Sequence, residues 1–206
     1  MRHIRLLLYV LILAVAAPAL GAPRDYVVTP GAPNEVVFES SAAIETFQGK
    51  TRALSGSIHV DPAALEDSVS LHFEVDLATL STGLPKRDKH MRENHLEVAT
   101  YPKATFDGVA VLGPARQLAL GVKTPLDVEG TFAIHGASHR LHLTVETTLV
   151  RDKSGEAIQF QTAFPVSLAG YGIPRPEFLV LKLADVQKVS VRGIATSRTR
   201  EALAGH

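Results

Sequence analysis

Three histidines lie close together in the second half of the sequence and are the first candidates for a metal-binding or catalytic site. His135, His139 and His142 supply imidazole nitrogens, which are common ligands of zinc and other divalent ions. The residues around them alternate between polar and apolar, so His142 is expected on the polar face of a strand and the other two in a turn. No carboxylate or fourth ligand stands at a matching spacing. We therefore expect exposed histidines and no metal site, with a metal-dependent hydrolase as the least favoured alternative.

Other catalytic signatures are missing from the sequence. There is no Gly-x-Ser-x-Gly or Ser-x-x-Lys nucleophile motif and no Gly-rich phosphate loop. Cysteine is absent, which excludes thiolate nucleophiles, thiolate metal sites and disulfides. His90 and His95 do not have the i,i+4 spacing of a metal pair on a helix. Carboxylates such as Glu74, Asp76 and Glu146 are scattered over strand faces, and no pair stands out. The sequence therefore predicts no catalytic residue, no enzyme activity and no cofactor.

Length and charge limit the remaining function classes. The chain has 206 residues, 46% of them hydrophobic, which suits one domain with a single core. Lysine and arginine together number 21, and so do aspartate and glutamate. A nucleic-acid partner needs a surplus of basic residues to neutralise phosphates, so no such partner is expected.

Residues 1–22 have the layout of a secretory signal peptide. Arg2 and Arg5 make a short basic start, residues 6–15 are apolar, and small residues follow up to Ala22. The apolar run is shorter than the roughly twenty residues that a membrane-spanning helix needs, which argues against a membrane anchor. We expect residues 1–22 to be removed and residues 23–200 to form one domain in the periplasm or outside the cell.

Most of the chain after residue 23 alternates between apolar and polar residues with a period of two, which is typical of half-buried strands. Residues 68–77 are the clearest case. The side chains that would share the apolar face of this strand are Val69, Leu71, Phe73, Val75 and Leu77. Similar runs cover residues 34–40, 55–60, 103–111, 127–134, 140–146, 157–168 and 185–195. Short strands with turn signals about every ten residues predict an antiparallel sandwich or barrel.

Two segments interrupt the strands. Residues 135–138 (HGAS) lie between two alternating runs and predict a tight hairpin. Residues 85–94 (PKRDKHMREN) show no alternation, consist mostly of helix formers and begin with a proline, which suits a first helical turn. We expect a short helix there, with Leu84, Met91 and Leu96 along a narrow apolar edge.

The apolar face of the strands is open to two interpretations. In a barrel of about eight strands, the inward side chains either fill the interior or leave room for one small ligand. The chain has Phe and Tyr but no Trp, so its inward side chains are of modest size. The residues alone are compatible with two interiors: a cavity for a ligand, or the filled core of a ligand-free accessory or stress-related protein.

Three pairs of segments carry a family resemblance. They are residues 55–62 and 75–80 (SGSIHVDP and VDLATL), residues 86–92 and 101–106 (KRDKHMR and YPKATF), and residues 130–136 (GTFAIHG) before the strand at 140–145. In this order and spacing they resemble the YceI-like family of exported lipid- and polyisoprenoid-binding proteins. Residues 171–173 and 185–191 (YGI and DVQKVSV) near the C-terminus also fit. The resemblance departs at residues 167–178, where an Asn-Arg pair of many members is missing.

The resemblance implies an all-β fold, an extended antiparallel lipocalin-like β-barrel with one short helix near its mouth. The lumen would hold a polyisoprenoid, an isoprenoid quinone or a fatty-acid derivative for transport or sequestration. The side chains expected to contact this ligand are Val69, Leu71, Phe73, Val75, Phe106, Phe132, Ile134, Leu141, Leu143 and Phe164. Lys86, Arg87 and His90 are expected at the mouth, beside the head group. The expected partners are this lipid-like molecule and, transiently, a membrane, and the oligomeric state is left open.

Overall fold

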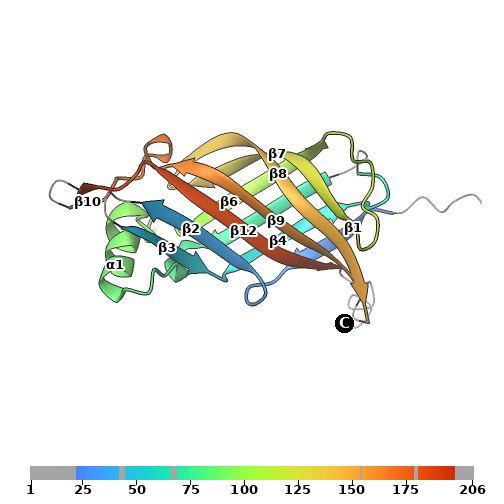
Figure 1. Cartoon of the computed structure of the whole chain (residues 1–206), viewed down its shortest axis with the longest axis horizontal. Coiled ribbons are helices and arrows are strands. Elements are labelled where there is room, and N and C mark those ends of the chain that lie inside the picture. The colour runs from blue at the N-terminus through green and yellow to red at the C-terminus, as the bar shows by residue number, and fades with distance from the viewer. Residues whose placement is uncertain (1–21, 42–44, 66–68, 154, 179–180, 198–206) are drawn as a thin grey trace, which may run out of the picture.

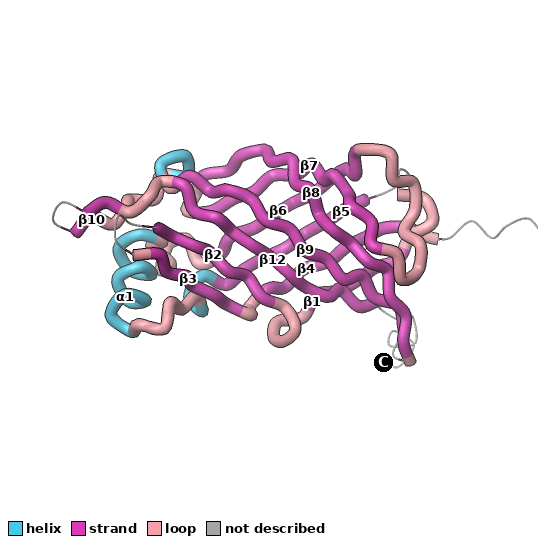
Figure 2. Tube along the Cα trace, viewed as in Figure 1, coloured by secondary structure: helices cyan, strands magenta, loops and turns pink. Residues whose placement is uncertain are grey.

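The computed structural model of this chain describes residues 22–41, 45–65, 69–153, 155–178 and 181–197. The predicted signal peptide lies outside the described residues, apart from Ala22. Within the described ranges, no helix is long and apolar enough to cross a bilayer. Strands make up most of the structure, and the short helices lie toward one end of it (Figure 2).

Eight antiparallel strands close into an elongated barrel (Figure 1). Around the barrel they follow the order β1 (Arg24–Val28), β4 (Leu54–Val60), β5 (Val69–Asp76), β6 (Lys103–Leu112), β7 (Lys123–Ile134), β8 (Ala137–Asp152), β9 (Gly155–Ser167) and β12 (Val186–Ser197). The barrel closes where β1 pairs with the end of β12, through Tyr26 with Ser197 and Val27 with Thr196. The predicted all-β class and antiparallel barrel are confirmed.

Two further strands extend the barrel wall at one end. β2 (Glu35–Ser41) pairs with an earlier part of β12 than β1 does, and β3 (Thr46–Thr51) pairs with β2. Lys50 and Ser81 form a bridge that ties β3 to the segment before the helix α1 (Pro85–His90). The perimeter of the barrel therefore gains two strands at the end where α1 lies (Figure 1).

The remaining elements also lie toward the α1 end. They are η1 (Leu77–Thr79), η2 (Met91–His95), η3 (Ala169–Tyr171) and the two-stranded hairpin of β10 (Glu177–Phe178) and β11 (Leu181–Lys182). The predicted helix is confirmed, because α1 continues directly into the π-helical turn η2. Its expected apolar edge is wrong at Leu84, which precedes α1 and is 54% exposed, whereas Met91 and Leu96 face the barrel interior.

β7 and β8 are joined by a turn of two residues. The backbone φ angles of His135 and Gly136 are +54° and +77°. Turns with two left-handed residues match the right-handed twist of the paired strands, which makes them the favoured short hairpin connection. The imidazole of His135 also packs on the ring of Tyr101, with their centroids 4.6 Å apart. The predicted tight hairpin is confirmed, with two turn residues rather than four.

Candidate functional site

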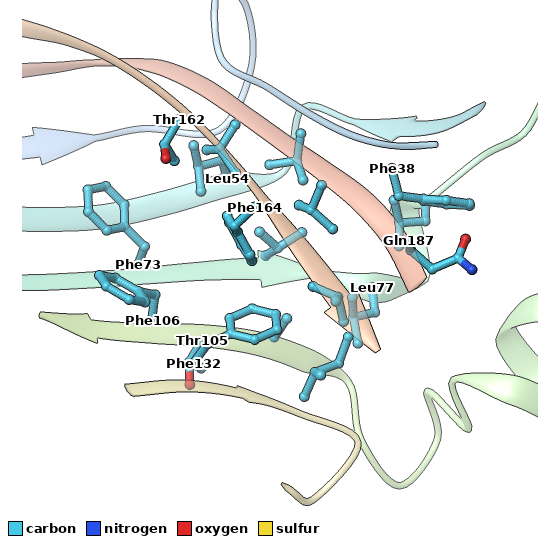
Figure 3. A pocket seen from close by; sticks show the side chains of 18 of the residues that line it. Phe38, Leu54, Phe73, Leu77, Thr105, Phe106, Phe132, Thr162, Phe164 and Gln187 are labelled. Atoms are coloured by element: carbon cyan, nitrogen blue, oxygen red, sulfur yellow. The ribbon is translucent and has the colours of Figure 1, made fainter. Parts of the chain in front are cut away.

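The barrel encloses a cavity of about 1020 Å³. Its walls are the inward side chains of the barrel strands, and η1, η2 and α1 add to them at one end. Within the barrel the polar lining consists of Thr105, Thr147, Thr162 and Gln187, and the rest of the wall there is apolar (Figure 3). Cavities that bury a drug-sized ligand measure about 300–1,000 Å³ and are mostly apolar. The interior is therefore large enough and apolar enough for one long lipid-like molecule.

The inward side chains of β5 show that the lumen is hollow. Val69, Leu71, Phe73 and Val75 all line the cavity, yet each is only partly buried. In a filled core, alternating inward residues of this kind are covered by their neighbours. Here they keep accessible surface because the opposite wall does not reach them. The structure therefore has a cavity where the sequence also allowed a filled core.

Inward-facing glycines help to keep this space open. A Cβ atom placed on Gly56 would lie 2.7 Å from the ring of Phe73, and one on Gly193 would lie 2.5 Å from the ring of Phe160. Each aromatic residue is paired across the strands with its glycine. The rings therefore lie flat against the barrel wall, over the glycines, instead of projecting across the lumen.

The predicted ligand-contacting residues are almost all brought together around this cavity. Nine of them line it: Val69, Leu71, Phe73, Val75, Phe106, Phe132, Ile134, Leu143 and Phe164. Leu141, on the same face of β8 as Leu143, does not line the cavity itself. It packs against the apolar cluster around Leu143, and the ring of Phe106 covers its strand partner Gly130.

The cavity reaches the surface at the α1 end. Lys86, Arg87 and His90 line it there, together with the exposed Glu45, so the structure places all three predicted mouth residues at an opening. At the other end Leu65 and Leu118 close the lumen, and both are buried. Backbone hydrogen bonds of 2.9 Å from Leu65 to Arg116 and of 2.7 Å from Leu118 to Pro62 hold these two loops together.

Arg87 is fixed in place at the mouth. Its guanidinium lies 4.0 Å from the centre of the Phe47 ring, in the geometry of a cation–π contact. It also donates a hydrogen bond of 3.2 Å to the carboxylate of Glu45 and one of 2.8 Å to the hydroxyl of Thr82. Lys86 has no hydrogen bond or ion pair among the described residues. The free cation at the mouth is therefore Lys86, because Arg87 already has an acidic partner.

Asp88 anchors the helix beside the mouth, which sequence analysis did not foresee. Its carboxylate is 6% exposed and accepts hydrogen bonds from the Ser81 hydroxyl and from the backbone N–H and hydroxyl of Thr82. Burial by itself raises the pKa of Asp88, but these hydrogen bonds outweigh it and hold the pKa below its usual value. The Ser-Thr pair ahead of Pro85 is a signal that could have indicated this contact.

Two histidines, His90 and His95, pack edge to face at the mouth. The Nδ1 of His95 donates to the carbonyl oxygen of Pro174 at 2.8 Å, and its Nε2 lies 3.1 Å from the Nδ1 of His90. Burial lowers the pKa of His95, as does the neighbouring His90, while the bond to Pro174 opposes both. A neutral His95 with its proton on Nδ1 can accept a hydrogen bond from His90, which leaves the Nε2 of His90 available at the mouth.

The histidines near the β7–β8 turn do not form a metal centre. His135 lies 3.2 Å from the Glu97 carboxylate, whereas His139 contacts the carbonyl oxygen of Gly170 at 2.8 Å, and His142 is exposed on β8. Across the described parts of the chain, no three ligating side chains converge on one point. The described residues therefore lack the convergence of ligands that would have supported a hydrolase built on these three histidines.

Comparison with known proteins identifies relatives of this barrel. The YceI-like domain family matches residues 26–193. Among solved structures, a polyisoprenoid-binding domain from Saccharophagus degradans superposes with a TM-score of 0.67 at 21% identity, covering 84% of this chain and 98% of that one. BcnA of Burkholderia cenocepacia gives a TM-score of 0.63 at 21% identity, covering 80% and 98% of the two chains.

A third structural relative is the YceI protein of Campylobacter jejuni, with a TM-score of 0.61 at 19% identity, over 76% of this chain and 88% of that one. At these identities the structural likeness shows the fold alone. A search of curated protein sequences gives no match.

Proposed function

This chain belongs to the YceI-like family, and we propose that it binds one long apolar amphiphile in its barrel and carries or sequesters it without chemical conversion. The candidate ligands are a polyisoprenoid, an isoprenoid quinone and a fatty-acid derivative. The Saccharophagus degradans relative is a polyisoprenoid-binding domain, which supports this class. The observation that carries the proposal is the apolar cavity of about 1020 Å³, which opens at one end.

The apolar wall supplies the binding free energy. Burial of apolar surface contributes about 25 cal/mol per Å², from which the cost of ordering the ligand is subtracted. A long hydrocarbon chain along β5, β6 and β7 would contact side chains such as Phe73, Phe106 and Phe132 over its whole length. Two of the three threonines of the wall do not oppose this, because the hydroxyls of Thr147 and Thr162 are already bonded to backbone carbonyls.

The polar head of the ligand would stay at the mouth. Lys86 is available there, and the Nε2 of His90 has no partner among the described residues. An apolar tail placed inward and a head group placed beside α1 satisfy both the apolar wall and these polar groups. The predicted signal peptide supports a location for this binding in the periplasm or outside the cell.

The test is purification of the mature protein from its native host, followed by organic extraction and mass spectrometry. A stoichiometric isoprenoid or fatty-acyl molecule is the expected result, and it would name the ligand. A protein that yields no lipid on extraction and does not bind added quinone, polyprenol or fatty acid would overturn the proposal in favour of a ligand-free accessory protein.

Two variants of β8 show whether the lumen is where the ligand lies. Val145 lines the cavity and is only partly buried, so Val145→Trp places an indole in the lumen. His142 is exposed on the outer face of the same strand, and His142→Trp is the matched control. Loss of bound lipid in the first variant but not in the second is expected. Equal lipid content in both would show that the ligand binds elsewhere.

A further inference from the structure

The mouth end of the barrel exposes large apolar side chains. Four such residues are more than half exposed in the described structure: Leu84, Leu120, Val122 and Val186. Leu84 lies immediately before α1, and Val186 begins β12 at the same end of the barrel (Figure 1). Leu120 and Val122 belong to the loop before β7, at the closed end. Exposed apolar residues are common on protein surfaces, so exposure alone does not distinguish the two ends.

Charge and the position of the cavity opening together distinguish the two ends. The segment of α1 and η2 carries Lys86, Arg87, Lys89 and Arg92 against Asp88 and Glu93, in a chain whose basic and acidic residues balance overall. Lys86 has no partner among the described residues, and Lys89 has only a distant one, the Glu93 carboxylate at 4.0 Å. At the closed end, by contrast, Lys123 is paired with Glu146 at 2.7 Å. Lys153 is exposed at the closed end as well, so the mouth end is set apart by the combination of free lysines, exposed apolar side chains and the cavity opening.

The helix that presents these residues is held firmly. Asp88, on the opposite face of α1 from solvent, accepts three hydrogen bonds from Ser81 and Thr82, so the position of α1 against the barrel is fixed. Leu84, Lys86 and Lys89 consequently stand outward on a rigid support. A rigid surface of this kind loses little side-chain and backbone freedom when it meets a flat partner.

We propose that the α1 end of the barrel, with Leu84, Lys86, Lys89 and Val186, docks on the surface of a bilayer that contains anionic phospholipids. Apolar side chains inserted at the acyl boundary and lysines beside anionic head groups together bind proteins to such surfaces. The occupant follows from charge complementarity and from the position of the cavity, whose opening lies within the same surface. Docking in this orientation would let an apolar ligand pass between bilayer and lumen without crossing water.

The experiment is sedimentation of the mature protein with vesicles, which needs no knowledge of the ligand. Vesicles of phosphatidylglycerol with phosphatidylcholine are compared with phosphatidylcholine alone, at low ionic strength and at about 1 M salt, where the Debye length falls to about 3 Å. We expect binding to the anionic vesicles and its loss at high salt. Failure to bind anionic vesicles at low ionic strength, or equal binding to neutral ones, would overturn the proposal.

A matched pair of variants locates the docking surface. The mouth variant combines Leu84→Ser with Lys86→Gln and Lys89→Gln and removes the proposed docking surface. The closed-end variant makes the same kinds of change at the other end of the barrel, with Leu120→Ser, Lys123→Gln and Lys153→Gln. Leu84 and Leu120 are equally exposed, at 54%, and the ion pairs that the variants remove, Lys89 with Glu93 and Lys123 with Glu146, lie on the surface, so folding should change little. The mouth variant should bind anionic vesicles at least about tenfold more weakly, and the closed-end variant should bind as wild type does.

Equal losses in the two variants would contradict a specific docking face. A wild-type dimer in solution that the mouth variant abolishes would assign this face to a second copy of the chain instead, and would also overturn the proposal. Extraction of bound lipid is measured separately on the same preparations, so the docking proposal and the ligand-binding proposal can fail independently.

Discussion

The hydroxyl of Tyr26 donates a hydrogen bond to the carboxylate of Glu156 and so joins β1 to β9 across the place where the barrel closes. This place is weak in backbone pairing, since β1 and β12 share only two paired positions. Glu156 is 7% exposed and also accepts hydrogen bonds from Arg24 at 2.8 Å and from Arg151 at 2.6 Å. Burial and the neighbouring carboxylate both raise the pKa of Tyr26, so its hydroxyl stays protonated and remains a donor.

Loss of this contact is expected to destabilise the barrel. Glu156→Gln leaves two arginines without their acidic partner, and because both arginines are about half exposed the loss is expected to cost about 1–2 kcal/mol. Tyr26→Phe removes one donor and is expected to cost about 1–2 kcal/mol. Urea unfolding followed by circular dichroism measures both values. A change below about 0.5 kcal/mol for Glu156→Gln would show that the solvent-exposed parts of Arg24 and Arg151 make the network unimportant.

The same carboxylate predicts a dependence of stability on pH. Burial raises the pKa of Glu156, but hydrogen bonds from Tyr26 and Arg151 outweigh it and hold the pKa below the usual 4.5. A depressed pKa adds stability that is complete above the unfolded value and disappears as the pH falls through the folded value. The difference in unfolding free energy between wild type and Glu156→Gln should therefore be constant above about pH 5 and shrink below about pH 4.5. Unfolding curves across this range test it, and a difference that grows in acid contradicts it.

Gly49 on β3 offers a way to narrow the lumen near its mouth. The three atoms nearest to a Cβ atom at this position all belong to the ring of Phe38. The ring is the movable partner, so Gly49→Ala should push Phe38 into the cavity rather than break the sheet. We expect bound lipid to fall several-fold with a stability change below about 1.5 kcal/mol. Gln48→Ala, on the outer face of the same strand, is the control and should retain its lipid.

Asp88→Ala should loosen α1 at the mouth. The substitution leaves the backbone N–H of Thr82 without its partner, and an unsatisfied buried group costs about 1–3 kcal/mol. Hydrogen–deuterium exchange should rise in residues 81–95 more than in the β7–β8 hairpin. Lys89→Ala changes the exposed side of the same helix and should leave this exchange unaltered. An even rise over the whole barrel would indicate global destabilisation instead.

Phe73→Asp tests the apolar character of the wall. Phe73 lines the cavity and packs on Phe160, with ring centroids 5.3 Å apart. An unpaired carboxylate there costs several kcal/mol, so bound lipid, stability or both should decrease. Ser70→Asp, on the exposed outer face of the same strand, controls for the charge. Unchanged lipid content and unfolding free energy in Phe73→Asp would show that water fills this part of the lumen.

The strands, the short helix and the β7–β8 turn of this protein can be derived largely from patterns in its sequence. Alternation assigned most of the barrel strands, although β1 and β3 were missed because they are short and carry little periodicity. The turn at His135 and Gly136 and the helix after Leu84 were also visible, because turn chemistry and helix propensity act over a few neighbouring residues. The same alternation brought nine of the ten expected apolar ligand contacts to one cavity.

Whether that apolar face lines a cavity or a filled core depends on the tertiary structure. A pattern of inward residues is the same in a filled and in a hollow barrel, and the outcome depends on strand number, stagger and the residues opposite. Phe73 over Gly56 and Phe160 over Gly193 are pairs that meet only when distant segments align. The burial of Asp88 and the exposure of Leu84 have the same cause, because each follows from contacts with residues that periodicity does not connect.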